Sequence, residues 1–539
     1  MNQTLLDYFL PVILYAETHY AFKGIYSRLK KKEPEIVFDA PHRIEPDSPI
    51  PVLMLCKDAH IYPVKVKDVE FVIMKEKDSV HVESHRLDEM IQDQFYWKIF
   101  EIQLPAEIFG NIQLDATFRI EINGRTKIYR NDNYRISSHL PFDICLADRC
   151  LPKSAGWYYG DLHYHSSYTN DQVEFGAPLE PTMRLAKAMG LSFYAVTDHS
   201  YDLDDHEDDH LKNDPFLSKW KRLQNEVKAL NESSKFSFRI IPGEEVSCGN
   251  KKNRNIHALL LNNPEFIAGQ GDSAEKWFRT SPDFTLREVL DMASEQSVVI
   301  AAHPEINPPL LQWLLIRRGK WHLSDYLHDG IIGLQVWNSQ DNHYFHQGLQ
   351  SWIKLLLLGK RKFIFAGNDA HGNFNRFRQI GFPFWTFREN KKEIFGQART
   401  GIFVIGEFTE ENIIKSIRNG RAIITNGPFA EIQLITENNA CAAIGDEVIG
   451  QSCQLKIAAY STGEFGSLTK VCVLIGNLPQ KREEIVLEKK DFRNCYVFEN
   501  HIAFESLPES GYFRMEAQSG RYDVRKCFTN PIWFKRTSR

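Results

Sequence analysis

Histidine and carboxylate side chains recur in the middle of the sequence, where they follow short apolar runs. The runs end near residues 196, 243, 302 and 367, and the side chains beyond them are His199, Glu245, His303, Asp369 and His371. His163, His165 and His257 lie beside further apolar stretches. Imidazole and carboxylate groups are the ligands that zinc, iron and manganese take in proteins. Because so many buried charges are costly unless they are neutralised, the pattern predicts a metal site.

The elements that must position these side chains are short buried strands. Continuous apolar runs alternate with helical patterns at residues 181–189 and 286–294, which is typical of parallel strands with helices on both faces. The carboxyl ends of parallel strands share one face, so residues far apart in sequence converge there. His163 and His165 are two residues apart, and alternate side chains of a strand point the same way. The pair can therefore grip one cation.

The flanking parts of the chain have β character. Apolar residues alternate over 112–122, Asn123-Gly124 favours a two-residue turn, and 126–129 can return as the partner strand. A further strand is predicted at 64–74, and a helix is possible before this first domain. After a helix at 409–419, strands are predicted at 454–459, 471–475, 512–517 and 530–534. The predicted domains are 1–155 (β-rich), 156–425 (α/β) and 426–539 (β-sandwich-like).

Composition narrows the class of protein. The net charge of −5 shows no excess of basic residues, so we expect no nucleic-acid partner. The apolar run at 9–16 has no preceding Lys or Arg, so we expect no signal peptide, and we expect no membrane span. Nine scattered cysteines without a CxxC pair indicate a reduced, cytoplasmic protein. The oligomeric state is left open.

The metal-ligand motifs resemble those of the PHP domain, a family named for polymerases and histidinol phosphatases. The matching segments, in the family's order, are Asp161-Leu162-His163-x-His165-Ser166, Thr197-Asp198-His199, Pro242-Gly243-x-Glu245, His257, Ala302-His303-Pro304 and Asn368-Asp369-Ala370-His371. The resemblance covers about residues 157–425. The flanking parts are similar to the carbaryl-hydrolase-like branch (CehA/McbA). This implies a distorted (β/α)7 barrel between antiparallel β domains.

The resemblance also implies two or three divalent metal ions, which would be zinc, manganese or iron. The first ion is assigned to His163, His165, Glu245 and Asp369, and the second to Glu245, His257 and His303. His199 and His371 are assigned to a third ion, with an acid or histidine from the first motif. The family pattern there is Ser-Asp-Gly, whereas this sequence has Thr169-Asn170-Asp171. Either Asp171 reaches the ion through a shifted loop, which we favour, or the third ion is weak or absent.

The mechanism expected of such a site is hydrolysis by a hydroxide that bridges two metals and attacks phosphorus or an acyl carbon. We assign His199, His371 and Asp369 to the catalytic centre, where either histidine can alternatively act as a general acid. Arg376 and Arg378 follow the last motif and are candidate substrate-binding residues, because guanidinium groups bind phosphate or carboxylate with two hydrogen bonds. Two surface arginines are the equally weighted alternative.

Three functions compete on this evidence. A phosphoesterase acting on a small-molecule ester leads, because that is the commonest activity of the family. A carboxyl-ester or carbamate hydrolase on the same metal site is the second, suggested by the three-domain layout. A metal-bearing protein that binds without turnover is the third, and only the Asn170 departure favours it.

Overall fold

The computed structural model describes residues 32–537 except 106, 135–136, 170–175, 208, 272–279, 309 and 377–391. The predicted N-terminal helix and the apolar run at 9–16 lie outside these residues. The described chain is mostly β, in several sheets. It forms two units: unit 1 is Met1–Cys150, His165–Gly190 and Asp369–Phe395, and unit 2 is Leu151–Tyr164, Leu191–Asn368 and Gly396–Arg539. None of the described helices combines the length and the apolar character needed to cross a membrane.

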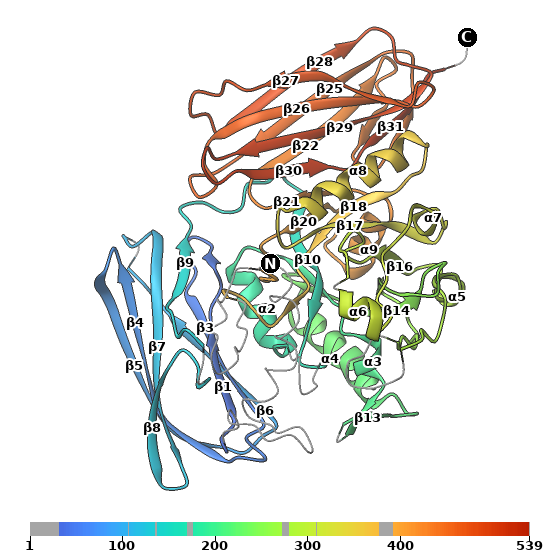
Figure 1. The fold of residues 1–539 in the computed structure, drawn as a ribbon. Coiled ribbons are helices and arrows are strands. Elements are labelled where there is room, and N and C mark those ends of the chain that lie inside the picture. The colour runs from blue at the N-terminus through green and yellow to red at the C-terminus, as the bar shows by residue number, and fades with distance from the viewer. Residues whose placement is uncertain are drawn as a thin grey trace. The chain divides into compact units, whose positions relative to one another are not determined.

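Unit 1 is built on two sheets, drawn in blue in Figure 1. The three-stranded sheet has the order β1-β3-β6, and the six-stranded sheet has the order β2-β9-β7-β4-β5 with β8 paired to β7. The bounds are β1 (Glu35–Asp39), β2 (Arg43–Ile44), β3 (Ile50–Lys57), β4 (Val64–Lys75), β5 (Asp78–Ile91), β6 (Phe95–Ile102), β7 (Gly110–Ile122), β8 (Arg125–Arg130) and β9 (Phe142–Leu146). Apolar side chains of both sheets, including Phe38, Phe71 and Phe118, form one buried cluster.

The predicted hairpin of unit 1 is confirmed. Strand β7 pairs with β8 in antiparallel register, with Ile122 opposite Arg125. Asn123 and Gly124 have φ values of 51° and 71°. A type I′ turn needs positive φ at both central residues, which Asn and Gly tolerate. The predicted strand at 64–74 is likewise found, as β4.

Helix α2 (Leu179–Ala188) belongs by contact to unit 1, whereas the sequence pattern assigned its residues to the middle domain. Ala188 lies in the core cluster of the N-terminal strands. Its carbonyl accepts the Glu45 N–H at 2.7 Å, and Arg43 donates to the Met189 carbonyl at 2.5 Å. The buried Arg43 side chain therefore holds the C-terminal end of α2.

Unit 2 contains the predicted buried strands. They are β10 (Trp157–His165), whose last residue falls in unit 1, and β11 (Phe193–Val196), β14 (Arg239–Gly249), β15 (Asn255–Leu261), β16 (Val298–Ala301), β17 (Ile331–Asn338) and β18 (Phe363–Gly367). Pairing is parallel along β10-β11-β14 and along β16-β17-β18, while β15 is antiparallel to both of its neighbours. No backbone pairing between β18 and β10 closes the ladder among the described strands, so the (β/α)7 barrel stays a prediction.

Helices separate most of these strands, as predicted, but β14 and β15 form an antiparallel hairpin where the pattern predicted parallel strands. The helices are α3 (Ser200–Leu203), α4 (Ser218–Ser233), α5 (Leu286–Met292), α6 (Leu310–Leu315), α7 (Leu323–Tyr326), α8 (His343–Leu357) and α9 (Glu410–Arg418), and a small hairpin of β12 (Asp205–His206) and β13 (Asp209–Asn213) precedes α4. Thr409 caps α9 by accepting the Asn412 N–H, and Gly420 at φ 67° ends it. Ile413, Ile414 and Ile417 form its buried face.

The C-terminal strands of unit 2 continue the same sheet through β20 (Arg399–Phe403), β21 (Ala422–Thr425), β30 (Arg525–Thr529), β29 (Ser510–Ser519), β26 (Leu468–Asn477) and β27 (Arg482–Lys489). A second sheet has the order β23 (Cys441–Ala443), β22 (Phe429–Thr436), β25 (Cys453–Tyr460) and β28 (Val497–Phe504). Strand β31 (Ile532–Lys535) pairs with β24 (Glu447–Ile449) and β29. Strand β19 (Ala370–His371) belongs to unit 1. The four strands predicted after residue 450 are all present.

Candidate metal centre

Strand pairing brings three predicted ligands of unit 2 to one place. His163 lies near the end of β10, His199 lies between the end of β11 and α3 as the N-cap residue of that helix, and Glu245 lies in β14. These strands are neighbours in parallel register, and the isolated bridge between His199 and Glu245 extends the β11–β14 pairing. The prediction that ligands collect at the ends of parallel strands holds for this part of the chain.

The antiparallel strand β15 and the end of β16 supply two further ligands. Glu245 and Ser247 lie on the same face of β14, and Ser247 pairs with His257, so His257 is the diagonal neighbour of Glu245. His303 follows β16 with φ 28°, a conformation that residues other than glycine rarely adopt. Such backbone outliers concentrate at functional sites because surrounding contacts must hold them.

The Glu245 carboxylate lies among four imidazole rings. Its Oε2 atom is 3.3 Å from His163 Nε2 and 3.1 Å from His199 Nδ1. Its Oε1 atom is 2.7 Å from His257 Nδ1 and 3.0 Å from His303 Nε2. Glu245 is fully buried, and His163, His199 and His257 are more than nine-tenths buried. The side chain of His303 is 11% exposed. Each carboxylate oxygen therefore faces two imidazole nitrogens.

Gln335 fixes how His163 faces this carboxylate. The Gln335 carbonyl oxygen accepts the backbone N–H of His303 at 3.2 Å and lies 2.9 Å from His163 Nδ1. His163 therefore donates from Nδ1, and in the neutral ring the lone pair of Nε2 points at Glu245 Oε2. Two lone pairs that face each other repel, and either a cation between them or a second proton on the ring relieves this.

The donor set fits a divalent metal. Tetrahedral ligand atoms about 2.1 Å from a zinc ion lie roughly 3.4 Å from one another. The His163–Glu245 and His199–Glu245 separations of 3.3 and 3.1 Å approach this spacing. A ligand histidine commonly donates its second N–H to a carbonyl or carboxylate, as His163 does to Gln335. His199, Glu245 and His257 together satisfy the geometry of a metal-binding group.

A buried carboxylate, Asp161, braces the end of β10. It accepts the backbone N–H groups of His163, Asn368 and Gly396 at 3.1, 3.1 and 3.0 Å, and the Asn368 side-chain amide at 2.6 Å. Burial raises the pKa of Asp161 to about 6 in spite of these hydrogen bonds, which lower it. Asp161 therefore ties three chain segments together behind His163.

Glu244, the neighbour of Glu245, has a different environment. Its carboxyl group accepts hydrogen bonds from Ser200 Oγ at 3.1 Å and from the Ile267 N–H at 3.1 Å. Burial raises the pKa of Glu244 to about 8. Successive residues of a strand point to opposite faces, so only Glu245 meets the histidines.

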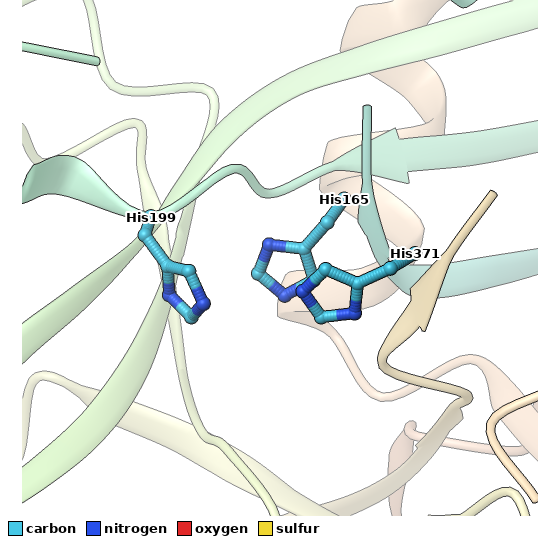
Figure 2. Close-up of side chains that lie close together, drawn as sticks. All are labelled: His165, His199 and His371. Atoms are coloured by element: carbon cyan, nitrogen blue, oxygen red, sulfur yellow. The ribbon is translucent and has the colours of Figure 1, made fainter. Parts of the chain in front are cut away.

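Three predicted ligands lie together in unit 1. His165 Nε2 is 3.1 Å from Asp369 Oδ1, and the rings of His165 and His371 stack with centroids 4.2 Å apart. Figure 2 shows the two stacked rings. His371 Nδ1 also lies 3.2 Å from the Asp369 carbonyl, and Asp369 has φ 54°. Two imidazoles and a carboxylate in contact are a second set of potential metal ligands.

The remaining predicted residues are placed as follows. Asn170, Asp171 and Arg378 lie outside the described residues. The guanidinium group of Arg376 donates to the Leu140 and Pro141 carbonyls at 2.9 and 2.5 Å, within unit 1. These bonds give Arg376 a structural role, and substrate binding by Arg376 stays a prediction.

Sequence reasoning missed the residues that support the ligands. Asp161 opens the first motif, but its supporting role was not predicted, and Gln335 is distinguished in the sequence only as a polar residue inside an apolar strand. Arg318 contacts His257 through its guanidinium group but follows no motif. Its position depends on long-range backbone contacts that a local pattern does not reveal.

Comparison with known proteins gives no family. No protein-family model and no curated protein matches the chain. Matches among solved structures include β-glucuronidase 2 of Bacteroides uniformis, with 8% identity, a TM-score of 0.19 and coverage of 95% of this chain and 62% of that one. A glycosyl hydrolase family 2 member of Bacteroides cellulosilyticus has 10% identity and a TM-score of 0.17, covering 94% and 63%. The β-glucuronidase of Parabacteroides merdae has 8% identity and a TM-score of 0.17, covering 94% and 64%.

The chain therefore spans about three fifths of the length of these structures. TM-scores this far below 0.5 carry no argument about fold or function. The function has to be argued from the candidate metal centre itself.

Proposed function

We propose that the chain is a divalent-metal-dependent hydrolase of the PHP type that acts on phosphoesters. The observation that carries this proposal is the buried Glu245 carboxylate with two imidazole nitrogens against each oxygen. Glu245 would hold divalent cations together with His163 and His199 on one carboxylate oxygen and with His257 and His303 on the other. This grouping follows the two carboxylate oxygens, whereas the family resemblance assigns His199 to a third ion.

The chain's own residues give the centre its rigidity. Gln335 fixes the ring orientation of His163, and Asp161 holds the end of β10 through the backbone. The resemblance also assigns metal ligation to His165, Asp369 and His371, a set that already lies together in unit 1. In the proposed reaction His199 or His371 is available to move a proton to the leaving group, in addition to any role as a ligand.

Divalent cations held there would polarise the ester and make a nucleophile available at neutral pH. The protein contributes fixed ligands and a buried, low-dielectric setting, in which developing negative charge is stabilised more strongly than in water. Supporting residues of this kind typically change metal affinity or activity 10- to 100-fold, so roughly that effect is expected of Gln335.

The neighbouring glutamates provide the test. We expect Glu245→Gln to lose most of its bound zinc, manganese or iron, measured by elemental analysis of purified protein, and to lose activity at least about 100-fold. Glu244→Gln is the matched control, because the same change is made one residue away at a buried carboxyl that faces Ser200. It should keep its metals, with circular dichroism showing that both variants fold. Equal metal content in the two variants contradicts the proposal.

A substrate panel separates the competing functions. The metal-loaded protein is assayed on phosphomonoesters, phosphodiesters and aryl carboxyl esters. Turnover of the carboxyl esters alone would replace the proposal by a carboxyl-ester or carbamate hydrolase. Bound metal without turnover of any ester would indicate the binding protein.

A further inference from the structure

Arg318 places a fixed positive charge at the edge of the candidate metal centre. The residue lies just beyond α6, and its Nη1 atom contacts His257 Nε2 while Nη2 is 3.1 Å from His257 Nδ1. The same Nδ1 atom is 2.7 Å from Glu245 Oε1. A guanidinium group stays protonated at any physiological pH. The Arg318 guanidinium group therefore contacts a histidine that itself contacts the Glu245 carboxylate.

Backbone contacts hold Arg318 in this position. The segment around it forms a bridge with Asn255 at the start of β15, the Asn255 N–H donates to the Arg317 carbonyl at 3.0 Å, and the Gly319 N–H donates to the Asn255 carbonyl at 2.7 Å. The buried Asn255 side chain also donates to the Ile316 carbonyl at 2.8 Å. Arg318 is thus set by a strand-like pairing and not only by its own flexible side chain.

Four further cations lie on the same two segments, and we call them with Arg318 the basic rim: Lys251, Lys252, Arg254 and Lys320. The two segments are joined by hydrogen bonds, among them Asn250 Nδ2 to the Lys320 carbonyl at 2.9 Å. Lys251 and Lys252 are exposed, and Lys320 pairs with Glu305 at 3.0 Å. Burial lowers the pKa of His322, and Lys252, Lys251 and Lys320 lower it further against the opposing effect of Asp325. The exposed Lys251 and Lys252 therefore add positive charge to the segment that pairs with the Arg318 segment.

Arg318 beside divalent cations is a repulsive arrangement unless an anion lies between them. We infer that Arg318 is the anion-binding residue of the metal centre, which holds the non-bridging phosphoryl oxygens of the substrate, and that the basic rim selects substrates with a second anionic group. This inference rests on the proposed function and names its substrate class as phosphoesters with more than one negative group. In the hydrolysis a water oxygen bonds to phosphorus, the ester P–O bond breaks, and the alcohol leaves with a proton.

Phosphate binding tests the role of Arg318 without reference to turnover. Inorganic phosphate is titrated into metal-loaded protein by isothermal calorimetry. Arg318→Gln is expected to raise the dissociation constant of phosphate about 10- to 100-fold, and Arg318→Lys is expected to give a value between those of the unaltered protein and Arg318→Gln. The matched control is Arg317→Gln, because the Arg317 guanidinium is bonded to Ser281 Oγ at 2.9 Å and to the Asn253 carbonyl at 3.1 Å. Equal phosphate affinity in the two glutamine variants, with metal content unchanged, overturns the role of Arg318.

The selectivity of the basic rim is tested by kinetics. A phosphomonoester with a second phosphate should have a KM roughly tenfold lower than the same ester without it, and the double variant Lys251→Gln/Lys252→Gln should abolish this difference in KM. Equal KM values in the unaltered protein overturn this part of the inference. Arg318-dependent phosphate binding by a protein that turns over no phosphoester would instead overturn the proposed function and leave the anion site standing.

Discussion

At the scale of single residues, Gln335 shows how a neutral side chain can decide the chemistry of a charged centre. Its side-chain carbonyl oxygen accepts the backbone N–H of His303, which fixes the position of that oxygen. The same oxygen accepts the Nδ1–H of His163. His163 must then present its other nitrogen as an acceptor to Glu245. The tautomer of one ring thus depends on a residue that is not itself a ligand.

Replacing Gln335 by leucine tests this dependence. Gln335→Leu keeps the side-chain volume but removes the acceptor, so His163 loses the hydrogen bond that selects its tautomer and orientation. We expect metal affinity to fall about 10- to 100-fold, measured by competition with a chromogenic chelator. Gln397→Leu, a half-buried glutamine that bonds to Ser339, serves as the control and should bind metal normally. Identical affinities would show that Gln335 does not set the ring.

Residue type and position in the sequence predicted the candidate metal ligands, but they did not predict the residues that contact and orient those ligands. His163, His199, Glu245, His257 and His303 were identified because each accompanies an apolar run, and the structure brings all five together. Arg318 is flanked by an ordinary loop sequence, and its contact with His257 arises from pairing with Asn255, which is far away in the sequence. No pattern of neighbouring residues encodes such a contact.

At the scale of elements, local patterns gave the strands and turns but not which sheet a helix joins. The alternation at 112–122 and the Asn123-Gly124 pair fix a hairpin within one stretch of chain. The amphipathic pattern of α2 shows that it has a buried face, but that pattern is the same for any apolar partner. Its assignment to unit 1 follows from Arg43 and Glu45, which are far away in sequence.

The connection after β22 predicts a pH-dependent contribution to stability. The N–H groups of Gln451 and Ser452 donate to the Glu437 carboxylate at 2.9 and 3.0 Å and lower its pKa to about 2. A folded pKa below the ordinary value of about 4.5 means that the contribution is complete above pH 4.5 and is lost as the pH falls toward 2. We expect Glu437→Gln to lower the melting temperature at pH 6 and to lower it by a clearly smaller amount at pH 3, because the contribution is already being lost there.

Differential scanning calorimetry over that range checks the prediction. Glu505→Gln removes an exposed carboxylate from the same group of C-terminal strands and is the control. A melting-temperature difference for Glu437→Gln that stays constant between pH 6 and pH 3 would rule out the linkage.

At the scale of the whole molecule, bound metal should stabilise the fold. The Glu245 carboxylate and four imidazole rings lie together in the interior of unit 2. Without a bound cation, the lone pairs of these groups repel one another unless the rings take up protons. A metal present at about 100 times its dissociation constant contributes roughly 2.7 kcal/mol to the free energy of unfolding. We expect a chelator to lower the melting temperature by several degrees, and added zinc or manganese to restore it.

The control for metal removal is Glu245→Gln. Because this variant is expected to hold little metal, the chelator should leave its melting temperature nearly unchanged. A chelator effect of the same size in both proteins would place the stabilising metal elsewhere in the chain.

The Gln335–His163 contact also determines when a metal can be captured during folding. The two residues are 172 positions apart, so closing this contact carries the entropic cost of a long loop. Contacts of such high contact order form late, after local hairpins and helices. The nascent chain therefore cannot orient His163 through this contact until residue 335 has been synthesised, which is after Glu245 and the other three histidines around it.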